Sequence, residues 1–143
     1  MPFDGIHDER RQYLLDRLDA VADLLACERL WCKRHLRQRD GSRCLLGALI
    51  DAKARWLLHR PLLGAVREIT GATYLRVESF NDAADTDFTL VRLVLDHLRV
   101  TLISGAYRKS RFEGLVYFLH LHFQRRAAIA LRASAGANNI VVG

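Results

Sequence analysis

Hydrophobic residues recur at three- and four-residue spacing along most of the chain, which is the pattern of amphipathic α-helices. The first such segment begins with Asp8 and Glu9, which suit the positive end of a helix dipole. The pattern predicts a first helix over about His7–Cys27. Its apolar positions are Leu14, Leu18, Val21, Ala22 and Leu25.

A nearly unbroken apolar run from Ser42 to Ile50 predicts a central helix that is apolar on most faces. The preceding Asp40-Gly41-Ser42 is a turn signal, and Ser42 is a suitable N-cap. Gly47 would allow another backbone to approach closely. We expect this helix to continue to about His59, with amphipathic helices packed around it.

Three more helices follow from the pattern. Pro61 suits the first turn of a short third helix that Gly71 closes. A fourth helix spans about Asp87–Ile103 and ends at Gly105. Ser110-Arg111-Phe112-Glu113 has the capping-box arrangement and opens a fifth helix through about Ala133.

The residues between and after these helices are less regular. Ala72–Phe80 contains residues typical of strands, but a single strand lacks a partner, so we expect a loop or a minor hairpin element. Residues 134–143 predict a mobile tail or a strand that pairs elsewhere. With 143 residues, half of them hydrophobic, and two prolines, the chain is predicted to be all-α. We expect a single compact bundle of about five helices forming one domain over residues 1–143, with its core at about 8–104.

Charge is distributed in patches, although the whole chain carries +6. Residues 1–28 contain three Arg against seven Asp and Glu, a net charge of −4. Residues 29–43 contain six Lys and Arg against Asp40, and residues 104–143 contain six against Glu113, so each segment carries +5. Clustered basic residues bind phosphates or acidic partners, so nucleic acid is a candidate ligand.

Three cysteines, an odd number, and the lack of a signal-like opening predict an intracellular, cytoplasmic protein with reduced thiols. Charged residues or His interrupt every long apolar run, so we expect no membrane span. No motif indicates a cofactor.

Trp31, then Cys44-Leu45-Leu46-Gly47-Ala48-Leu49, then Phe80-Asn81-Asp82 form a pattern. It resembles a family of small bacterial helical proteins known only as a domain of unknown function. The similarity covers about Leu14–Ser104 and leaves the fifth helix outside. The chain departs from the family pattern in having Phe80 where a tryptophan is expected and in lacking a long acidic loop before Cys44. The resemblance implies a fold core and no activity.

Cys44, near a helix N-terminus, has two interpretations. A lowered thiol pKa and partners drawn from His59, His97, Asn81 and Asp82 would make a cysteine-hydrolase arrangement. Free cysteine is also common as a small apolar core residue, which is the favoured interpretation.

Metal binding is a minor alternative at two places. Cys27, Cys32, His35 and Cys44 are zinc-ligand types, but their spacing is not that of a common zinc motif. His120 and His122 would share a face on a strand and diverge on a helix, and the pattern favours a helix. We therefore predict no metal site.

Asn81 and Asp82 are expected to cap the fourth helix or fix its entry turn. The alternative is that they line a pocket beside Trp31, with Cys44.

The basic residues form one phosphate-binding surface if the two basic segments meet, and otherwise are solvated faces. The candidates are Lys33, Arg34, Arg37, Arg39, Arg43, Arg108, Lys109, Arg111, Arg125 and Arg126. No DNA- or RNA-recognition signature accompanies them.

The sequence thus favours a helical module that binds rather than catalyses, with a protein partner or a second copy of the chain. The fifth helix is the expected contact surface because it carries Phe118, Leu119, Phe123 and Ile129. Non-specific nucleic-acid binding and a Cys44-dependent enzyme are the alternatives.

Overall fold

The computed structural model describes residues 4–105 and residue 126. The chain divides into two units, residues 1–108 and 109–143, and every element described below belongs to the first. The predicted fifth helix and the tail lie outside the described residues, and the single domain stays a prediction. The fold is compact and all-α, as predicted, with no sheet among the described residues.

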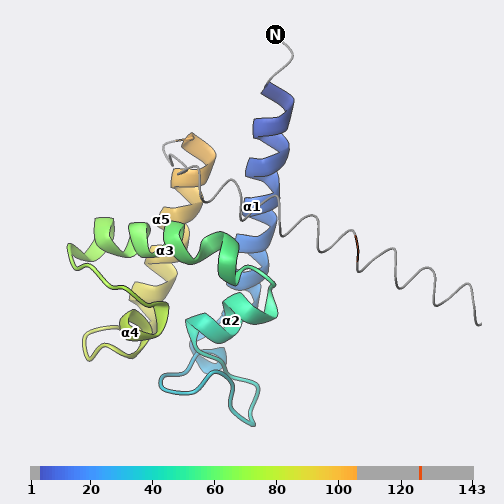
Figure 1. Cartoon of the computed structure of the whole chain (residues 1–143). Coiled ribbons are helices and arrows are strands. Elements are labelled where there is room, and N and C mark those ends of the chain that lie inside the picture. The colour runs from blue at the N-terminus through green and yellow to red at the C-terminus, as the bar shows by residue number, and fades with distance from the viewer. Residues whose placement is uncertain (1–3, 106–125, 127–143) are drawn as a thin grey trace, which may run out of the picture. The chain divides into compact units, whose positions relative to one another are not determined.

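Five α-helices and one short 3-10 helix make up the described part of the chain (Figure 1). In order they are α1 (Asp4–Leu24), η1 (Glu28–Leu30), α2 (Leu45–Asp51), α3 (Arg55–Thr70), α4 (Val77–Asp82) and α5 (Phe88–Ser104).

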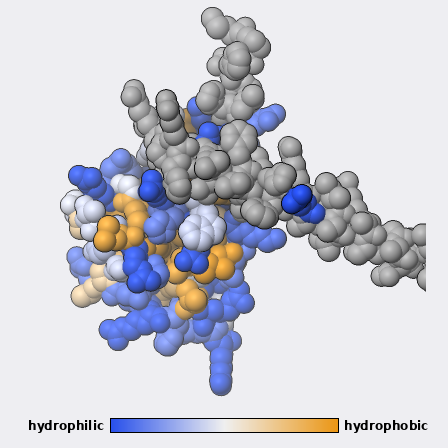
Figure 2. Space-filling model, viewed as in Figure 1, coloured by the Kyte–Doolittle hydropathy of each residue, from blue (hydrophilic) through white to orange (hydrophobic). Residues whose placement is uncertain are grey.

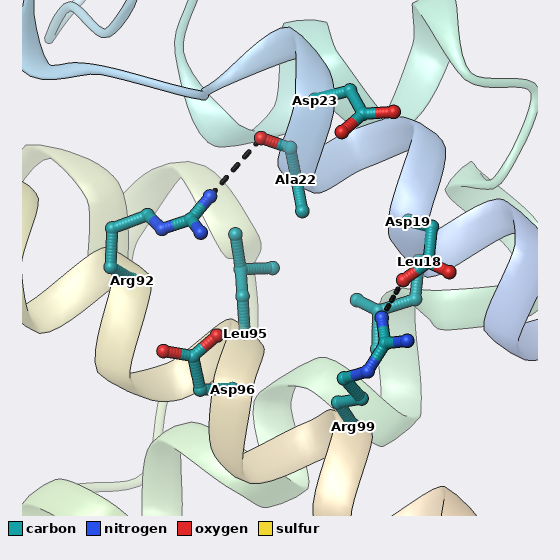
Figure 3. Close-up of a pocket in the computed structure, with 8 residues that line it drawn as sticks. All are labelled: Leu18, Asp19, Ala22, Asp23, Arg92, Leu95, Asp96 and Arg99. Carbon is teal, nitrogen blue, oxygen red and sulfur yellow. Dashed lines mark hydrogen bonds and ion pairs between the residues drawn. The ribbon is translucent and has the colours of Figure 1, made fainter.

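α1 and α5 pack as an antiparallel pair, and both were predicted close to their observed bounds. The Arg92 guanidinium donates to the carbonyl oxygens of Ala22 (3.1 Å) and Leu25 (3.4 Å) at the end of α1. Two turns further along α5, Arg99 pairs with Asp19, one turn earlier in α1 (Figure 3). The guanidinium of Arg92 thus donates to carbonyls at the C-terminus of α1, where few backbone donors are available.

α5 also packs against α3, so it contributes to the core on both its α1 side and its α3 side. At its ends, Asp87 is the N-cap and accepts from the Leu90 amide over 2.7 Å, and Gly105, the residue expected to end the helix, adopts φ 69°. None of the helices in the described part of the chain is long and apolar enough to cross a bilayer. The buried side chains of α5 are Val91, Val94, Leu95, Leu98 and Leu102.

Several large apolar side chains of this unit are exposed, and three of them belong to α5. On the face shown in Figure 2, small hydrophobic areas are separated by hydrophilic surface. The exposed large apolar side chains are Leu36, Ile50, Trp56, Leu75, Leu93, Val100 and Ile103.

The prediction of one central helix over Ser42–His59 is wrong. α2 ends at Asp51, and Lys53 takes a left-handed conformation (φ 55°) before α3 begins at Arg55. The Ala54 amide bonds the Leu49 carbonyl over 2.8 Å, which stabilises this sharp turn. Few non-glycine residues adopt a positive φ, so the sequence gives no signal for the break.

Two details at the ends of these helices also differ from expectation. Cys44, not Ser42, is the N-cap of α2, and its sulfur accepts the Gly47 amide over 3.3 Å. Pro61 lies inside α3 rather than opening a separate helix, while Gly71 closes that helix as expected, with φ 72°.

The segment expected as a loop or minor hairpin contains α4 instead. Val77, Phe80 and Asn81 are buried together at helical spacing, and the Phe80 ring lies 5.7 Å from the Tyr74 ring in an edge contact. A helix of six residues is too short to leave a periodic signal, so tertiary packing decides its structure.

Gly47 is where the loop before α2 touches the helix. A Cβ atom built at this position would overlap the carbonyl oxygen of Leu36 and press on Arg43. The glycine therefore lets the backbone of the loop lie directly on α2. The sequence predicted a close backbone approach at this glycine but not which segment makes it.

We predict that Gly47→Ala lowers the free energy of unfolding by about 2 kcal/mol, because the clash is with backbone that cannot rotate away. Urea denaturation followed by circular dichroism measures this. Gly64→Ala is the matched control: Gly64 lies within α3 and has open space around it. That substitution should stabilise the helix by about 0.5–1 kcal/mol. Equal effects at the two positions would contradict the packing described here.

Candidate functional site

The segment between α1 and α2 is largely irregular but is closed on itself by backbone hydrogen bonds. The Arg43 amide donates to the Leu30 carbonyl (2.9 Å), and the Cys32 amide donates to the Arg43 carbonyl (3.1 Å). At the tip, the Gln38 amide donates to the Ser42 carbonyl (2.8 Å), with Gly41 at φ 89°. We call residues 31–44 the α1–α2 loop.

The side chain of Asn81, in α4, anchors both ends of this loop. Its Oδ1 accepts from Trp31 Nε1 (2.8 Å) and from the Leu45 amide (3.0 Å). Its Nδ2 donates to the Cys32 carbonyl (3.2 Å) and to Asp82 Oδ1 (2.9 Å). Asn81 is fully buried, and these four bonds use both donors and both acceptor sites of its carboxamide.

Residues next to Asn81 at the end of α4 also bond the loop, closer to the protein surface. Asp82 Oδ1 accepts the Arg34 amide over 2.8 Å, and Arg34 is held at φ 65°. Lys33 Nζ donates to the Ala83 carbonyl over 2.7 Å and lies 5.7 Å from the centre of the Trp31 ring. The loop is therefore attached to the end of α4 by side chains and backbone together.

The expectation that Asn81 and Asp82 cap the fourth predicted helix is wrong, because Asp87 caps α5. The two residues instead hold the α1–α2 loop and the first turn of α2. The alternative was that the two residues line a pocket beside Trp31. They do lie near Trp31, but Asn81 bonds the Trp31 indole and Asp82 bonds the Arg34 amide.

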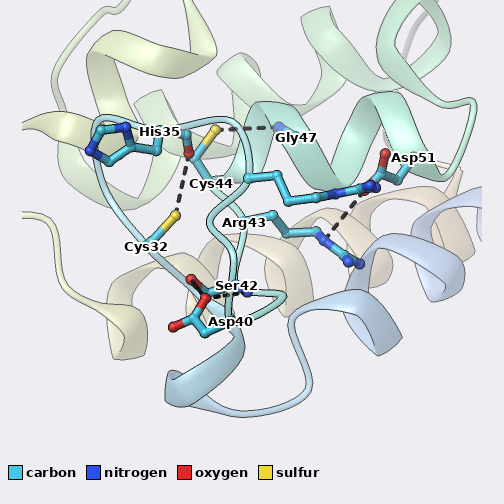
Figure 4. Close-up of polar contacts among 9 residues, drawn as sticks. Cys32, His35, Asp40, Ser42, Arg43, Cys44, Gly47 and Asp51 are labelled. Carbon is cyan, nitrogen blue, oxygen red and sulfur yellow. Dashed lines mark hydrogen bonds and ion pairs between the residues drawn. The ribbon is translucent and has the colours of Figure 1, made fainter.

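The cysteines of the loop are buried and bonded locally (Figure 4). Cys32 Sγ donates to the His35 carbonyl over 3.3 Å. Burial raises the pKa of the Cys44 thiol above its ordinary value, and the amides of Gly47 and Leu46 oppose this only in part. Burial raises the pKa of Cys32 as well. Neither thiol has the environment that produces a reactive thiolate.

The histidines proposed as bases for Cys44 lie on other helices. His97 Nε2 pairs with Glu68, which joins α5 to α3. His59 lies in α3, where burial lowers the pKa of its imidazole. Within the described residues, the Cys44 side chain forms its hydrogen bond with the Gly47 amide and not with a histidine.

The cysteine and histidine residues considered for zinc are not gathered into a site. Cys27 is exposed, whereas Cys32 and Cys44 are buried. The part of the chain that the structure describes contains no group of three or more His, Cys, Asp or Glu side chains placed to hold a metal ion. His120 and His122 lie outside that part.

The basic candidates of the loop divide into paired and unpaired side chains. Asp51 at the end of α2 pairs with Arg37 (2.5 Å) and Arg43 (3.3 Å). Arg34 and Arg39 are exposed, and neither guanidinium has an ion pair among the described residues. Arg126 is exposed. Four basic candidates lie outside the described residues: Arg108, Lys109, Arg111 and Arg125.

A second candidate is a groove of about 480 Å³ between α1 and α5 (Figure 3). Arg99 and Asp19 neutralise each other there. Asp23 and Asp96 line the same groove with no ion pair among the described residues. Sequence reasoning did not single out this groove, although the seven-residue spacing of Arg92 and Arg99 on one face of α5 is a signal for it. Its lining is Leu18, Asp19, Ala22, Asp23, Arg92, Leu95, Asp96 and Arg99.

Residues 9–99 match the model of a family of unknown function, DUF6197. The chain belongs to the DUF6197 family. The match runs from α1 into α5, so it includes the α1–α2 loop, Asn81 and the groove, and it leaves residues 110–133 outside, as the resemblance implied. No curated protein and no solved structure matches the chain.

We predict that Asn81→Leu lowers the free energy of unfolding by about 3 kcal/mol, because the Leu45 amide and Trp31 Nε1 lose a buried acceptor. Trp31→Phe is the graded control, since it removes one of the two donors to Asn81 Oδ1, and it should cost about 1 kcal/mol. Urea denaturation of both variants measures the difference. A loss for Asn81→Leu no larger than that for Trp31→Phe would show that Asn81 does not organise the loop.

We also predict the order in which the thiols react with iodoacetamide. At about pH 8 the exposed Cys27 should be alkylated first, and Cys44 should react more slowly than a cysteine in a free peptide, because burial disfavours its thiolate. The Cys44 rate should still be rising above about pH 9, since its pKa is raised. Mass spectrometry of timed samples gives each rate. A Cys44 that reacts as fast as Cys27 would restore the cysteine-enzyme alternative.

Proposed function

We propose that this DUF6197 unit is a binding module that engages a macromolecular partner through the α1–α2 loop and the adjoining end of α2. The surface concerned, here called the loop surface, consists of the exposed side chains Arg34, Leu36, Arg39, Ile50 and Lys53. The predicted fifth helix, expected earlier as the contact surface, lies outside the described residues and carries no part of this proposal.

The observation that carries the proposal is the exposure of two aliphatic side chains on rigid backbone. Leu36 is 52% exposed and Ile50 is 40% exposed. The Leu36 carbonyl accepts the Cys44 amide and lies against Gly47, one helical turn before Ile50. Backbone that is already held by such contacts loses little conformational entropy when a partner covers its side chains, which favours binding.

Charge supports the same surface. Residues 29–53 carry seven Lys and Arg against Asp40 and Asp51, a net charge of +5. Asp51 is already paired with two arginines of the loop, and Asp40 accepts both the amide and the hydroxyl of Ser42. The remaining cations are available to steer an anionic partner to the surface.

Crosslinking from a photoreactive residue tests the proposal in cells that carry the gene. A benzophenone side chain in place of Leu36 should give discrete covalent adducts, and Arg34→Glu with Arg39→Glu should reduce them at least about fivefold, as expected for electrostatic steering. The same group in place of Leu75, which is 86% exposed and lies between α3 and α4, controls for exposure alone. The same adducts from both positions, or none from position 36, would refute the proposal.

A further inference from the structure

We infer that the loop surface takes an acidic, amphipathic segment of another protein, one that presents carboxylates beside aliphatic side chains. This inference rests on the proposed function and adds the chemistry of the partner. Three properties of the surface lead to it: its exposed aliphatic side chains on hydrogen-bonded backbone, its unpaired cations and the lack of an available aromatic ring among residues 29–53.

The aliphatic and basic groups alternate over a short stretch of rigid structure. Leu36 lies between Arg34 and Arg39 in the loop, and Ile50 lies near Lys53 at the end of α2. Asp82 and Gly41 fix the backbone on either side of Leu36, through the Arg34 amide and the tip turn. A partner with leucine-like side chains flanked by Asp or Glu matches both features, since arginine binds carboxylates in a forked geometry.

A two-fold dimer in which this surface faces its own copy does not match it. In a two-fold dimer the same patch faces itself, so the +5 segment would oppose another +5 segment. Like charges brought together at an interface are unfavourable by several kcal/mol in general. The partner surface must therefore carry opposite charge.

A nucleic acid matches the charge but not the rest of the surface. Single-stranded nucleic acids stack their bases on exposed aromatic rings. Trp31 is the one Phe, Tyr or Trp residue in residues 29–53, and it is occupied: Nε1 bonds Asn81, Lys33 lies over the ring, and Phe88 lies 6.3 Å away. The exposed apolar groups are aliphatic instead, and these suit a protein.

The test compares three probes of equal net charge against the full chain. The first is a helical peptide with Leu at i and i+4 flanked by Glu, the second is the same peptide with Ser for Leu, and the third is a single-stranded DNA oligonucleotide. Fluorescence anisotropy at moderate salt gives each dissociation constant. The Leu peptide should bind at least about tenfold more tightly than either other probe, because only it supplies both contacts.

Matched variants assign the binding to the loop surface. Leu36→Ser should remove the preference for the Leu peptide over the Ser peptide, whereas Val100→Ser, at an exposed position of α5, should leave it unchanged. Arg39→Glu should weaken both peptides at least about fivefold. Arg67→Glu, an equal charge change on an exposed residue of α3, should weaken them much less. Circular dichroism confirms that all four variants are folded.

The outcomes separate this inference from the proposed function. Equal binding of the two peptides, tighter binding of DNA, or no binding of any probe would overturn the acidic-segment inference. Adducts from position 36 in cells would then still support a binding module with a partner of other chemistry. If no probe binds and no adducts form from position 36, the proposed function is refuted as well.

Discussion

The Asn81 carboxamide is the constraint on which the rest of this unit depends. A buried amide is costly unless each donor and acceptor has a partner, and here one side chain satisfies groups at both ends of the α1–α2 loop. It accepts from Trp31 and from the first amide of α2, and it donates to the carbonyl of Cys32. All these partners are 36 to 50 residues away in the chain, so the Asn81 side chain connects α4 to the α1–α2 loop and to the start of α2.

A loop fixed in this way acts as part of the scaffold. Gly47 lets its backbone rest on α2, Asp51 takes up two of its arginines, and Ser42 and Asp40 satisfy each other within its tip. What remains exposed is a small set of cations and aliphatic side chains on hydrogen-bonded backbone. Binding to such a surface requires little ordering of the backbone, and we therefore assign the partner to the loop and not to the buried cysteines.

The sequence predicts those features that local chemistry decides. The amphipathic periods of α1 and α5 and the left-handed glycines that end α3 and α5 follow from propensity and spacing, and the family followed from short motifs. The break at Lys53 and the helix α4 did not, because each results from packing between distant segments. The pattern placed Asn81 near Trp31 only by resemblance. Its hydrogen-bond partners could not be read from the chain, since three of its four bonds go to groups 36 to 50 residues away and leave no periodic or compositional trace.

Hydrogen exchange at three amides tests most directly whether the loop is held as described. The amides are those of Arg34, Arg43 and Leu45, which bond Asp82, Leu30 and Asn81. If the Asn81 network fixes the loop, NMR should show all three exchanging within about tenfold of the Ala48 amide inside α2, because they open only when the helix opens. Exchange of these amides near the rate of an unprotected peptide, with Ala48 still protected, would show that the loop moves independently and would contradict the account.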